Sequence, residues 1–571
     1  MRSRAFLVAL LAFVAGGLPV AAGAAPQVYD GGSFMWPSSP GKGYAGLYID
    51  DDISHTRLTS TLRNPSAVLC TSLNDATCGG KAVSVYAILP ACTASVTNDC
   101  IESVGAKPQS GTAEAGVFSR YLPDAGVADF AGDPAAKVPT GGAPGIWTLA
   151  NNPHAGGNEY MVVVSVAGTA ADSRKAFGET TIHASLYPVK VVAGQFSRNR
   201  PAPTSTGVSH PSIDRTSNCA SVAEGFCAAR QDFPAATAFS VGIRLSTPPT
   251  GWLHGRIFSP DISFSTVDGV TKLRVEATPA QVPAVATWGK VDTLPSSVNA
   301  GFCTLETNCA QSNPQSAGAH TAVESWRTVY GDKASWVRGH WMYMTLPGWI
   351  TTRCLADTSV LHGFVTTNAT GYAAGPPSFS SSDKSFSYTV ASPHYDENGG
   401  VIQGTYNFVV RSDTARCIYG IDEGTMSATV SITSTDGGDQ ASTAVVNVSD
   451  DGQWLKVSAS GFHYSSPVIK TTLTSSVPPK VVSTTPTSTR KAPALTTKRS
   501  ATGSSVAKYA GLTVASGSRV TLKVAASSAR VCRVSGTSVK GLKKGSCRVT
   551  VTVTPKKGKA ISKTVTLTVT G

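Results

Sequence analysis

Short runs in which apolar and polar residues alternate recur along this sequence and limit its fold more than any other feature. Near the C-terminus, Val549, Val551 and Val553 alternate with arginine and threonine, and Met426–Ile432 shows the same period. A period of two residues is typical of a β-strand with one buried face. The one clear helix candidate is Gly318–Tyr330, whose apolar residues recur at spacings of three and four. We therefore expect an all-β fold with several β-sandwich domains in series and one short helix.

Cysteine spacing indicates a disulfide-bonded protein. The chain has twelve cysteines, an even number, and most of them lie close to a neighbour in the sequence. Neighbour pairing predicts six disulfides, namely Cys70–Cys78, Cys92–Cys100, Cys219–Cys227, Cys303–Cys309, Cys354–Cys417 and Cys532–Cys547. Metal binding is the alternative, but the sequence has no CxxC pair and no histidine at ligand spacing from a cysteine. Disulfides in this number place the protein in an oxidising compartment.

The N-terminus has the pattern of an export signal. Arg2 and Arg4 precede an apolar run, Ala5–Val14, and Ala22–Ala24 offers a small-residue cleavage site. The run is short for a membrane span, so a retained anchor is the less favoured alternative. Because no later apolar run is long enough, we expect no transmembrane segment. The predicted location is secreted or extracellular, in association with the cell envelope.

Composition divides the chain into segments. The predicted segments are a signal peptide (1–25), three β domains (26–200, 201–345 with the helix, and 346–476), a disordered linker (477–506) and a basic C-terminal domain (507–571). The linker is rich in Pro, Thr and Ser and has almost no large apolar residues. Such a segment cannot bury enough surface to fold alone.

Charge is distributed unevenly between the two ends of the chain. Of 48 basic and 35 acidic residues, eighteen basic and no acidic ones lie in Val477–Gly571. Asymmetry of this kind indicates attachment to a polyanion, with surface charge kept for solubility as the alternative. The predicted polyanion-binding residues are Lys540, Lys543, Lys544, Arg548, Lys556, Lys557 and Lys559.

The expected partner of this basic end is an anionic cell-wall polymer or an acidic membrane surface. Nucleic acid is not an expected partner, because Tyr509 is the single aromatic residue of the tail and cannot form a stacking ladder.

No catalytic motif is present in the sequence. It contains no Gly-x-Ser-x-Gly elbow, no His-Glu-x-x-His pair and no phosphate-binding loop. His394 beside Asp396-Glu397 is the nearest approach to an acid–base cluster, and the following Asn398-Gly399 favours a hairpin turn there. We therefore predict no catalytic residue, no metal site and no cofactor.

Two further groups have alternative interpretations. The three carboxylates Asp50–Asp52 could share a Ca²⁺ ion, but they lack the alternate-position spacing of a calcium loop, so a solvated turn is favoured. The aromatic residues Trp336, Trp341, Tyr343 and Trp349 could stack on sugars, but filling of a β-sandwich core is favoured.

Two resemblances add to these predictions. The segments Val531–Gly536 and Lys544–Val549 resemble the bacterial immunoglobulin-like repeats of exported surface proteins, in which a similar Cys–Gly–Cys pattern staples two strands. The resemblance implies that the C-terminal domain is a small immunoglobulin-like module. That fold carries many functions and assigns none by itself.

Segments of the preceding part, including Arg416–Gly420, Gly461–Pro467, Cys92–Val104 and Trp252–Val275, are similar to uncharacterised secreted proteins of actinobacteria. This resemblance implies compartment and architecture only. The function expected from the sequence is that of an exported, non-enzymatic protein whose basic end docks on an anionic polymer. The alternative is a secreted carbohydrate-active or other hydrolytic enzyme whose carboxylates are dispersed in the sequence.

Overall fold

The fold is taken from a computed structural model of the 571-residue chain. The structure describes residues 43–50, 60–122, 129–170, 180–193, 219–223, 225–296, 310–311, 319–346, 353–357, 359–373, 375–419, 426–433, 445–464, 468–475, 493–515, 517–556 and 560–570. Within these ranges no helix is both long and apolar enough to cross a membrane. The predicted signal peptide lies outside them.

The chain forms two compact units, Met1–Pro479 and Lys480–Gly571. The first is called the body and the second the C-terminal module. The body is built around one large central sheet. Its strands are, in spatial order, β2 (Thr61–Arg63), β3 (Val83–Ile88), β8 (Glu159–Ala170), β9 (Thr180–Ala193), β16 (Trp336–Leu346), β13 (Gly251–Val267), β17 (Leu361–Thr367), β21 (Gln403–Arg411), β24 (Trp454–His463) and β23 (Val445–Asp450).

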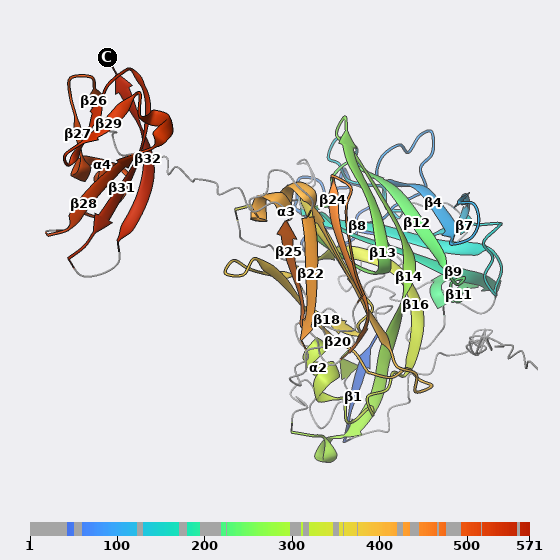
Figure 1. The fold of residues 1–571 in the computed structure, drawn as a ribbon. Helices are drawn as coiled ribbons and strands as arrows, with labels where there is room; N and C mark the ends of the chain where they lie inside the picture. Colours follow the sequence, from blue (N-terminus) through green and yellow to red (C-terminus); the bar gives the residue numbers. More distant parts are fainter. Residues whose placement is uncertain are drawn as a thin grey trace, which may run out of the picture. The chain divides into compact units, whose positions relative to one another are not determined.

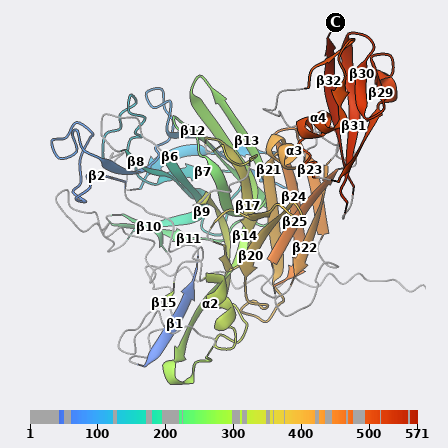
Figure 2. The same ribbon diagram turned by 90° about the vertical axis from the view of Figure 1, so that its left-hand side faces the viewer.

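Neighbouring strands of the central sheet are antiparallel, except that β13 and β17 run parallel. Figure 2 shows β2 and β8 toward one end of the body and β22 and β24 toward the other. A front sheet covers one side of the central sheet. It consists of β4 (Cys100–Pro108), β12 (Thr237–Leu245), β14 (Val270–Lys290) and the second half of β13.

A rear sheet covers part of the other side of the central sheet. Its strands are β18 (Gly371–Tyr372), β19 (Ser378–Ser380), β20 (Ser385–Ala391), β25 (Val468–Ser475) and β22 (Met426–Thr433). The remaining elements of the body are β1 (Tyr44–Ile49), β5 (Glu114–Ala115), β6 (Val117–Tyr121), β7 (Gly145–Thr148), β10 (Cys219–Ala223), β11 (Phe226–Arg230), β15 (Ala310–Gln311), η1 (Val291–Thr293), α2 (Ala319–Ser325) and α3 (Ser412–Tyr419). The all-β fold class predicted from the sequence is confirmed.

Apolar side chains are buried on both sides of the central sheet, and they form two cores of the body. On the front side, Leu186 of the central sheet packs in one cluster with Val241 of the front sheet. On the rear side, the Trp252 ring lies 6.1 Å from the Phe386 ring of the rear sheet, between ring centres. Because side chains alternate along a strand, one sheet supplies both cores.

Two unusually long strands join the parts that the sequence divided into three domains. β13 has 17 residues and β14 has 21, and both appear as long green strands in Figure 1. β14 pairs in turn with β13, with β16 and with β1. The β1–β14 pair crosses the predicted boundary at residues 200 and 201, the β13–β17 pair crosses the boundary at residues 345 and 346, and β16 itself spans the latter. Alternation predicted the strands but carried no information on their partners, which is why the body differs from three domains in series.

The helices differ from the prediction in number and length. The predicted helix begins at Ala319 but ends at Ser325, and a turn continues to Asp332. Its expected apolar face is present, because Val323 and Trp326 are buried against strand β1. Helix α3 was not predicted, because its eight residues span little more than two turns and offer too short a periodic pattern.

The C-terminal module is a small sandwich of two sheets. One sheet contains β26 (Leu495–Thr496), β32 (Ile561–Thr570), β31 (Gly545–Thr554) and β28 (Arg519–Val524), and the other contains β27 (Ala501–Thr502), β30 (Ser538–Gly541) and β29 (Cys532–Ser535). The module also has α4 (Gly503–Tyr509) and η3 (Ala526–Ser528).

The prediction that residues 477–506 form a disordered linker is wrong for the C-terminal end of that segment. Residues 493–506 contain β26, β27 and the start of α4, and Leu495 and Val506 are buried in the core of the module. The side chain of Thr502 caps the helix by accepting a hydrogen bond from the Ser505 amide. These apolar residues are too few and too scattered to predict folding alone, and they become buried only against β31 and β32.

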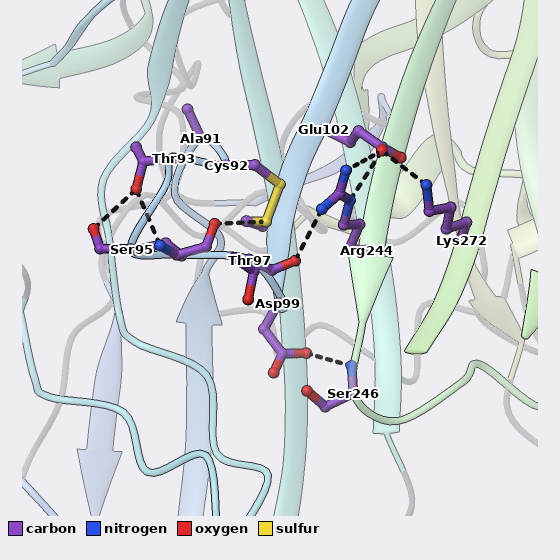
Figure 3. The surroundings of a disulfide bond; sticks show 12 residues. Ala91, Cys92, Thr93, Ser95, Thr97, Asp99, Glu102, Arg244, Ser246 and Lys272 are labelled. Atoms are coloured by element: carbon purple, nitrogen blue, oxygen red, sulfur yellow. Dashed lines mark hydrogen bonds and ion pairs between the residues drawn. A yellow bond between two sulfur atoms is a disulfide. The ribbon is translucent and has the colours of Figure 1, made fainter. Parts of the chain in front are cut away.

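Five of the predicted disulfides are present. They are Cys70–Cys78, Cys92–Cys100, Cys219–Cys227, Cys354–Cys417 and Cys532–Cys547. Cys303 and Cys309 lie outside the described residues. Figure 3 shows how the Cys92–Cys100 turn is fixed to the front sheet, where the Asp99 carboxylate accepts a hydrogen bond of 2.8 Å from the Ser246 amide.

Candidate functional site

The first sheet of the C-terminal module exposes cationic side chains because of its alternation. In β31, Cys547, Val549, Val551 and Val553 are buried, whereas Arg548 is exposed. In the neighbouring strand β28, alternation exposes the basic and hydroxyl side chains in the same way. The strand with one buried face that alternation predicted around Val549–Val553 is therefore confirmed.

Strand register brings the outward residues of β28, β31 and β32 onto one surface. Lys523 lies opposite Thr550 and Arg519 opposite Thr554, while Arg548 lies opposite Thr566 on the other side. We call this surface the threonine face. It consists of Arg519, Thr521, Lys523, Ser546, Arg548, Thr550, Thr552, Thr554, Ser562, Thr564, Thr566 and Thr568.

The second sheet also exposes cations, on the opposite side of the module. Lys540 on β30 lies directly opposite Arg533 on β29, and both side chains are exposed. Their neighbours Cys532 and Val539 point into the core. The disulfide Cys532–Cys547 joins the two sheets, so the outward side chains of β29 and β30 face away from the threonine face.

The predicted polyanion-binding residues are thus divided between several parts of the module. Arg548 belongs to the threonine face, and Lys540 belongs to the opposite sheet. Lys543 and Lys544 are exposed in the turn between β30 and β31, and Lys556 is exposed just after β31. Lys557 and Lys559 lie outside the described residues.

The exposed cations that were missing from the predicted set include Arg519, Lys523 and Arg533. The prediction favoured residues clustered in sequence, but cross-strand pairing groups residues that are far apart in sequence. The period-two pattern of β28 could have identified Arg519 and Lys523, since both alternate with partly buried apolar residues.

Nothing within the module neutralises this charge through a side chain. Val477–Gly571 contains no aspartate or glutamate, so no lysine or arginine of this segment can form an ion pair with a side-chain carboxylate of the same segment. Like charges spread over a small sandwich repel one another and attract counterions. The arrangement is suited to binding anions by charge, and the segment contains no carboxylate or imidazole side chain.

In the body, the prediction of a solvated turn at Asp50–Asp52 is wrong for Asp50. Its side chain is buried at the end of β1 and accepts a hydrogen bond of 3.3 Å from the indole nitrogen of Trp336. Asp51 and Asp52 lie outside the described residues. The pairing of β1 with β14, which places Trp336 beside Asp50, links residues almost 290 positions apart in the sequence and leaves no local signal.

His394 is also placed differently from the simplest expectation. Its Nδ1 is paired with the Asp332 carboxylate and lies 3.1 Å from the Arg327 guanidinium, which in turn contacts Glu324 at 2.6 Å. Asp396 instead accepts hydrogen bonds from the amides of Asn398 and Gly400, which forms the predicted hairpin turn. His394, which follows β20 of the rear sheet, therefore belongs to an ion-paired network with Glu324, Arg327 and Asp332. These three residues lie in the segment that connects β14 to β16.

The described members of the aromatic group, Trp336, Trp341 and Tyr343, do not form a platform. Trp341 and Tyr343 are buried in the front core, whereas Trp336 is partly exposed and packs on Tyr48 with ring centres 6.0 Å apart. Trp349 lies outside the described residues. The prediction that these aromatic residues fill the core is therefore confirmed for Trp341 and Tyr343.

A groove of about 340 Å³ crosses the sheet end formed by β2, β3, β8 and β9. Its lining residues are Thr61, Arg63, Ser84, Val85, Tyr86, Ala167, Gly168, Thr169 and Thr181. A glycosidase needs two carboxyl groups flanking the scissile bond, and this lining contains none.

Fold and site together define an all-β, disulfide-bonded protein with a basic C-terminal sandwich. No protein-family model matches the chain, and no curated protein matches it significantly.

Proposed function

We propose that the protein is exported and non-enzymatic, and that its C-terminal module attaches it to anionic polymers of the cell wall or cell surface. The export pattern of residues 1–25 and the five disulfides support an extracellular location. In this proposal the β-rich body is the part presented to the outside, and the module is the anchor.

One observation carries the proposal: the module exposes cations on both of its sheets and has no acidic side chain. Each lysine or arginine close to a polyanion contributes about 1 kcal/mol at low ionic strength, by analogy with basic segments on acidic membranes. Several such contacts together give firm binding. Because the cations are exposed, salt screens them, and the Debye length falls from about 30 Å at 0.01 M to about 3 Å at 1 M salt.

The test compares the full-length exported protein with a variant that ends at Pro479. Both are mixed with isolated cell walls at about 0.01 M salt, and the bound fraction is measured as salt is raised to about 1 M. We expect the full-length protein to bind and then to be released, and the truncated variant to stay in solution. Walls stripped of their anionic polymers serve as the matched control and should retain neither protein.

Retention of the truncated variant would place the anchor in the body and overturn the proposal. Retention of the full-length protein at high salt, or on stripped walls, would show that binding is not electrostatic and would overturn it equally.

A further inference from the structure

The hydroxyl groups of the threonine face form an ordered array. The Thr550 and Thr564 hydroxyl oxygens lie 2.8 Å apart across β31 and β32, and those of Thr552 and Ser562 lie 2.7 Å apart. In each pair one hydroxyl donates to the other, so the accepting hydroxyl keeps its own proton for a ligand. Each pair therefore offers the ligand one oriented donor as well as acceptor lone pairs.

One cation, Lys523, stands in register with a hydroxyl pair, and Arg519 and Arg548 lie opposite threonines elsewhere on the face. Lys523, Thr550 and Thr564 form one row across the three strands, and the next row contains Thr521, Thr552 and Ser562. Neighbouring strands are about 4.8 Å apart and alternate residues of one strand about 6.7 Å apart, so the face is a grid of these dimensions. Cationic side chains and neutral hydroxyl groups are therefore interspersed on the face, at separations of about 5–7 Å.

We infer that the threonine face is the surface that contacts the polymer, and that its ligand is a linear polyol phosphate, a chain of alcohol or sugar units joined by phosphodiesters. This inference rests on the proposed function and specifies its ligand. Phosphates along such a chain pair with Arg519, Lys523 and Arg548, and the hydroxyls between them bond to the threonine rows.

Other anionic partners fit this face less well. Stacking of nucleic-acid bases needs aromatic side chains, and the threonine face has none. Insertion into a lipid surface needs large apolar groups, whereas the outward residues here are hydroxyl-bearing or charged. The opposite sheet has the pair Arg533 and Lys540 but only short strands of four residues, so it offers no comparable array.

The first experiment locates the surface with two charge-matched variants of the full-length protein. One replaces two cations of the threonine face by glutamate (Lys523→Glu with Arg548→Glu), and the other replaces two exposed cations outside that face by glutamate (Lys498→Glu with Arg499→Glu). Binding to immobilised poly(glycerol phosphate) is measured at low salt. We expect the first variant to bind at least roughly tenfold more weakly and the second to change by less than about threefold.

The outcomes separate the two proposals. An equal loss in both variants would overturn the assignment of the face and leave the proposed function standing, because net charge alone would then govern binding. Unchanged binding in both variants would overturn the proposed function as well.

The second experiment tests the hydroxyl array without changing charge. Thr550→Val, Thr552→Val and Thr564→Val are combined, since valine keeps the shape and strand preference of threonine. The control combines Thr513→Val with Thr537→Val, two exposed threonines outside the face. Probes are poly(glycerol phosphate), inorganic polyphosphate, which lacks the polyol, and vesicles of phosphatidylglycerol.

We expect the triple valine variant to bind poly(glycerol phosphate) roughly tenfold more weakly, because it loses a few hydrogen bonds to the ligand. Its binding to polyphosphate should be unchanged, and the control should match the parent protein on every probe. Equal losses on both polymers, or no loss on either, would overturn the ligand class. Tighter binding of the parent protein to vesicles than to poly(glycerol phosphate) would also overturn it, in favour of a lipid surface. Thermal unfolding of each variant confirms that the module remains folded.

Discussion

The guanidinium carbon of Arg256 lies 4.3 Å from the centre of the Tyr372 ring, inside the body. Arg256 is fully buried on β13, and its guanidinium donates hydrogen bonds to the carbonyl oxygens of Thr367 at 3.0 Å and Thr370 at 3.3 Å. The His254 ring stacks on the same tyrosine, with ring centres 3.8 Å apart. A buried charge is thus held by carbonyl oxygens and an aromatic face where the central and rear sheets meet.

We predict that Arg256→Met lowers the free energy of unfolding of the body by about 2–4 kcal/mol, because two buried carbonyl groups lose their charged donor. Tyr372→Phe should cost less than about 1 kcal/mol, since the ring is kept. Urea unfolding measures both. Arg274→Met, at an exposed position of β14, is the matched control and should change stability by under about 0.5 kcal/mol. A cost for Arg256→Met no larger than that of the control would contradict the argument.

The stability of the body should fall as the pH falls below about 6.5. Burial lowers the pKa of His340 to about 3, assisted by Arg230, Arg256 and Arg338 and opposed by Asp50. Burial likewise lowers the pKa of His183 to about 4. The unfolded chain therefore binds protons that the folded body does not, and each histidine removes up to about 1.4 kcal/mol per pH unit between the two pKa values.

Urea unfolding from pH 7 to pH 4 would check this, with His340→Gln as the variant. The stability of the variant should decline less steeply than that of the parent. The C-terminal module provides an internal control, because Val477–Gly571 contains no Asp, Glu or His and its unfolding should hardly depend on pH in this range. Parallel pH profiles of parent and variant would refute the role of His340.

Glu102 on β4 is linked through charge to two other strands of the front sheet, β12 and β14. Its carboxylate accepts hydrogen bonds from Arg244 Nε at 2.9 Å and from Lys272 Nζ at 3.1 Å, as Figure 3 shows. The Arg244 hydrogen bond is the main cause of a lowered pKa of Glu102. The stabilisation is therefore present above the usual glutamate pKa and is lost as the pH falls below it.

Glu102→Gln should cost about 0.5–1 kcal/mol at neutral pH, a modest value because the group is partly exposed. A double-mutant cycle with Arg244→Met isolates the pair energy, which should shrink at high salt. A coupling energy of zero at low salt would show that the contact adds no stability.

Removal of the Cys532–Cys547 disulfide should destabilise the C-terminal module. The bond closes a 15-residue separation and joins the two sheets of the sandwich. Replacing both cysteines by alanine should cost about 3 kcal/mol, through the greater entropy of the unfolded chain. Calorimetry would show a lower unfolding temperature for the module. Replacing Cys219 and Cys227 in the body is the control, and an equal effect of that change on the module would argue against the local role.

Sequence by itself determined the features that depend on neighbouring residues. Alternation in β31 fixes which side chains enter the core, so the outward position of Arg548 follows from the sequence. Short cysteine separations likewise determined pairs such as Cys92–Cys100, because a short loop leaves few other partners within reach. The excess of positive charge in the last segment is also a property of composition alone.

Only the tertiary structure decided which distant strands become neighbours. The pairing of β14 with β1 and of β13 with β17 merges the predicted domains into one body, and Asp50 is buried beside Trp336 of β16. The bridge between Lys333 and Tyr395 brings His394 to Asp332. Register likewise placed Lys523 beside Thr550 and put Lys540 on the opposite sheet. The physical reason is that a period of two residues specifies the face of a strand but not its partner, which is selected by packing and hydrogen bonding across the whole sheet.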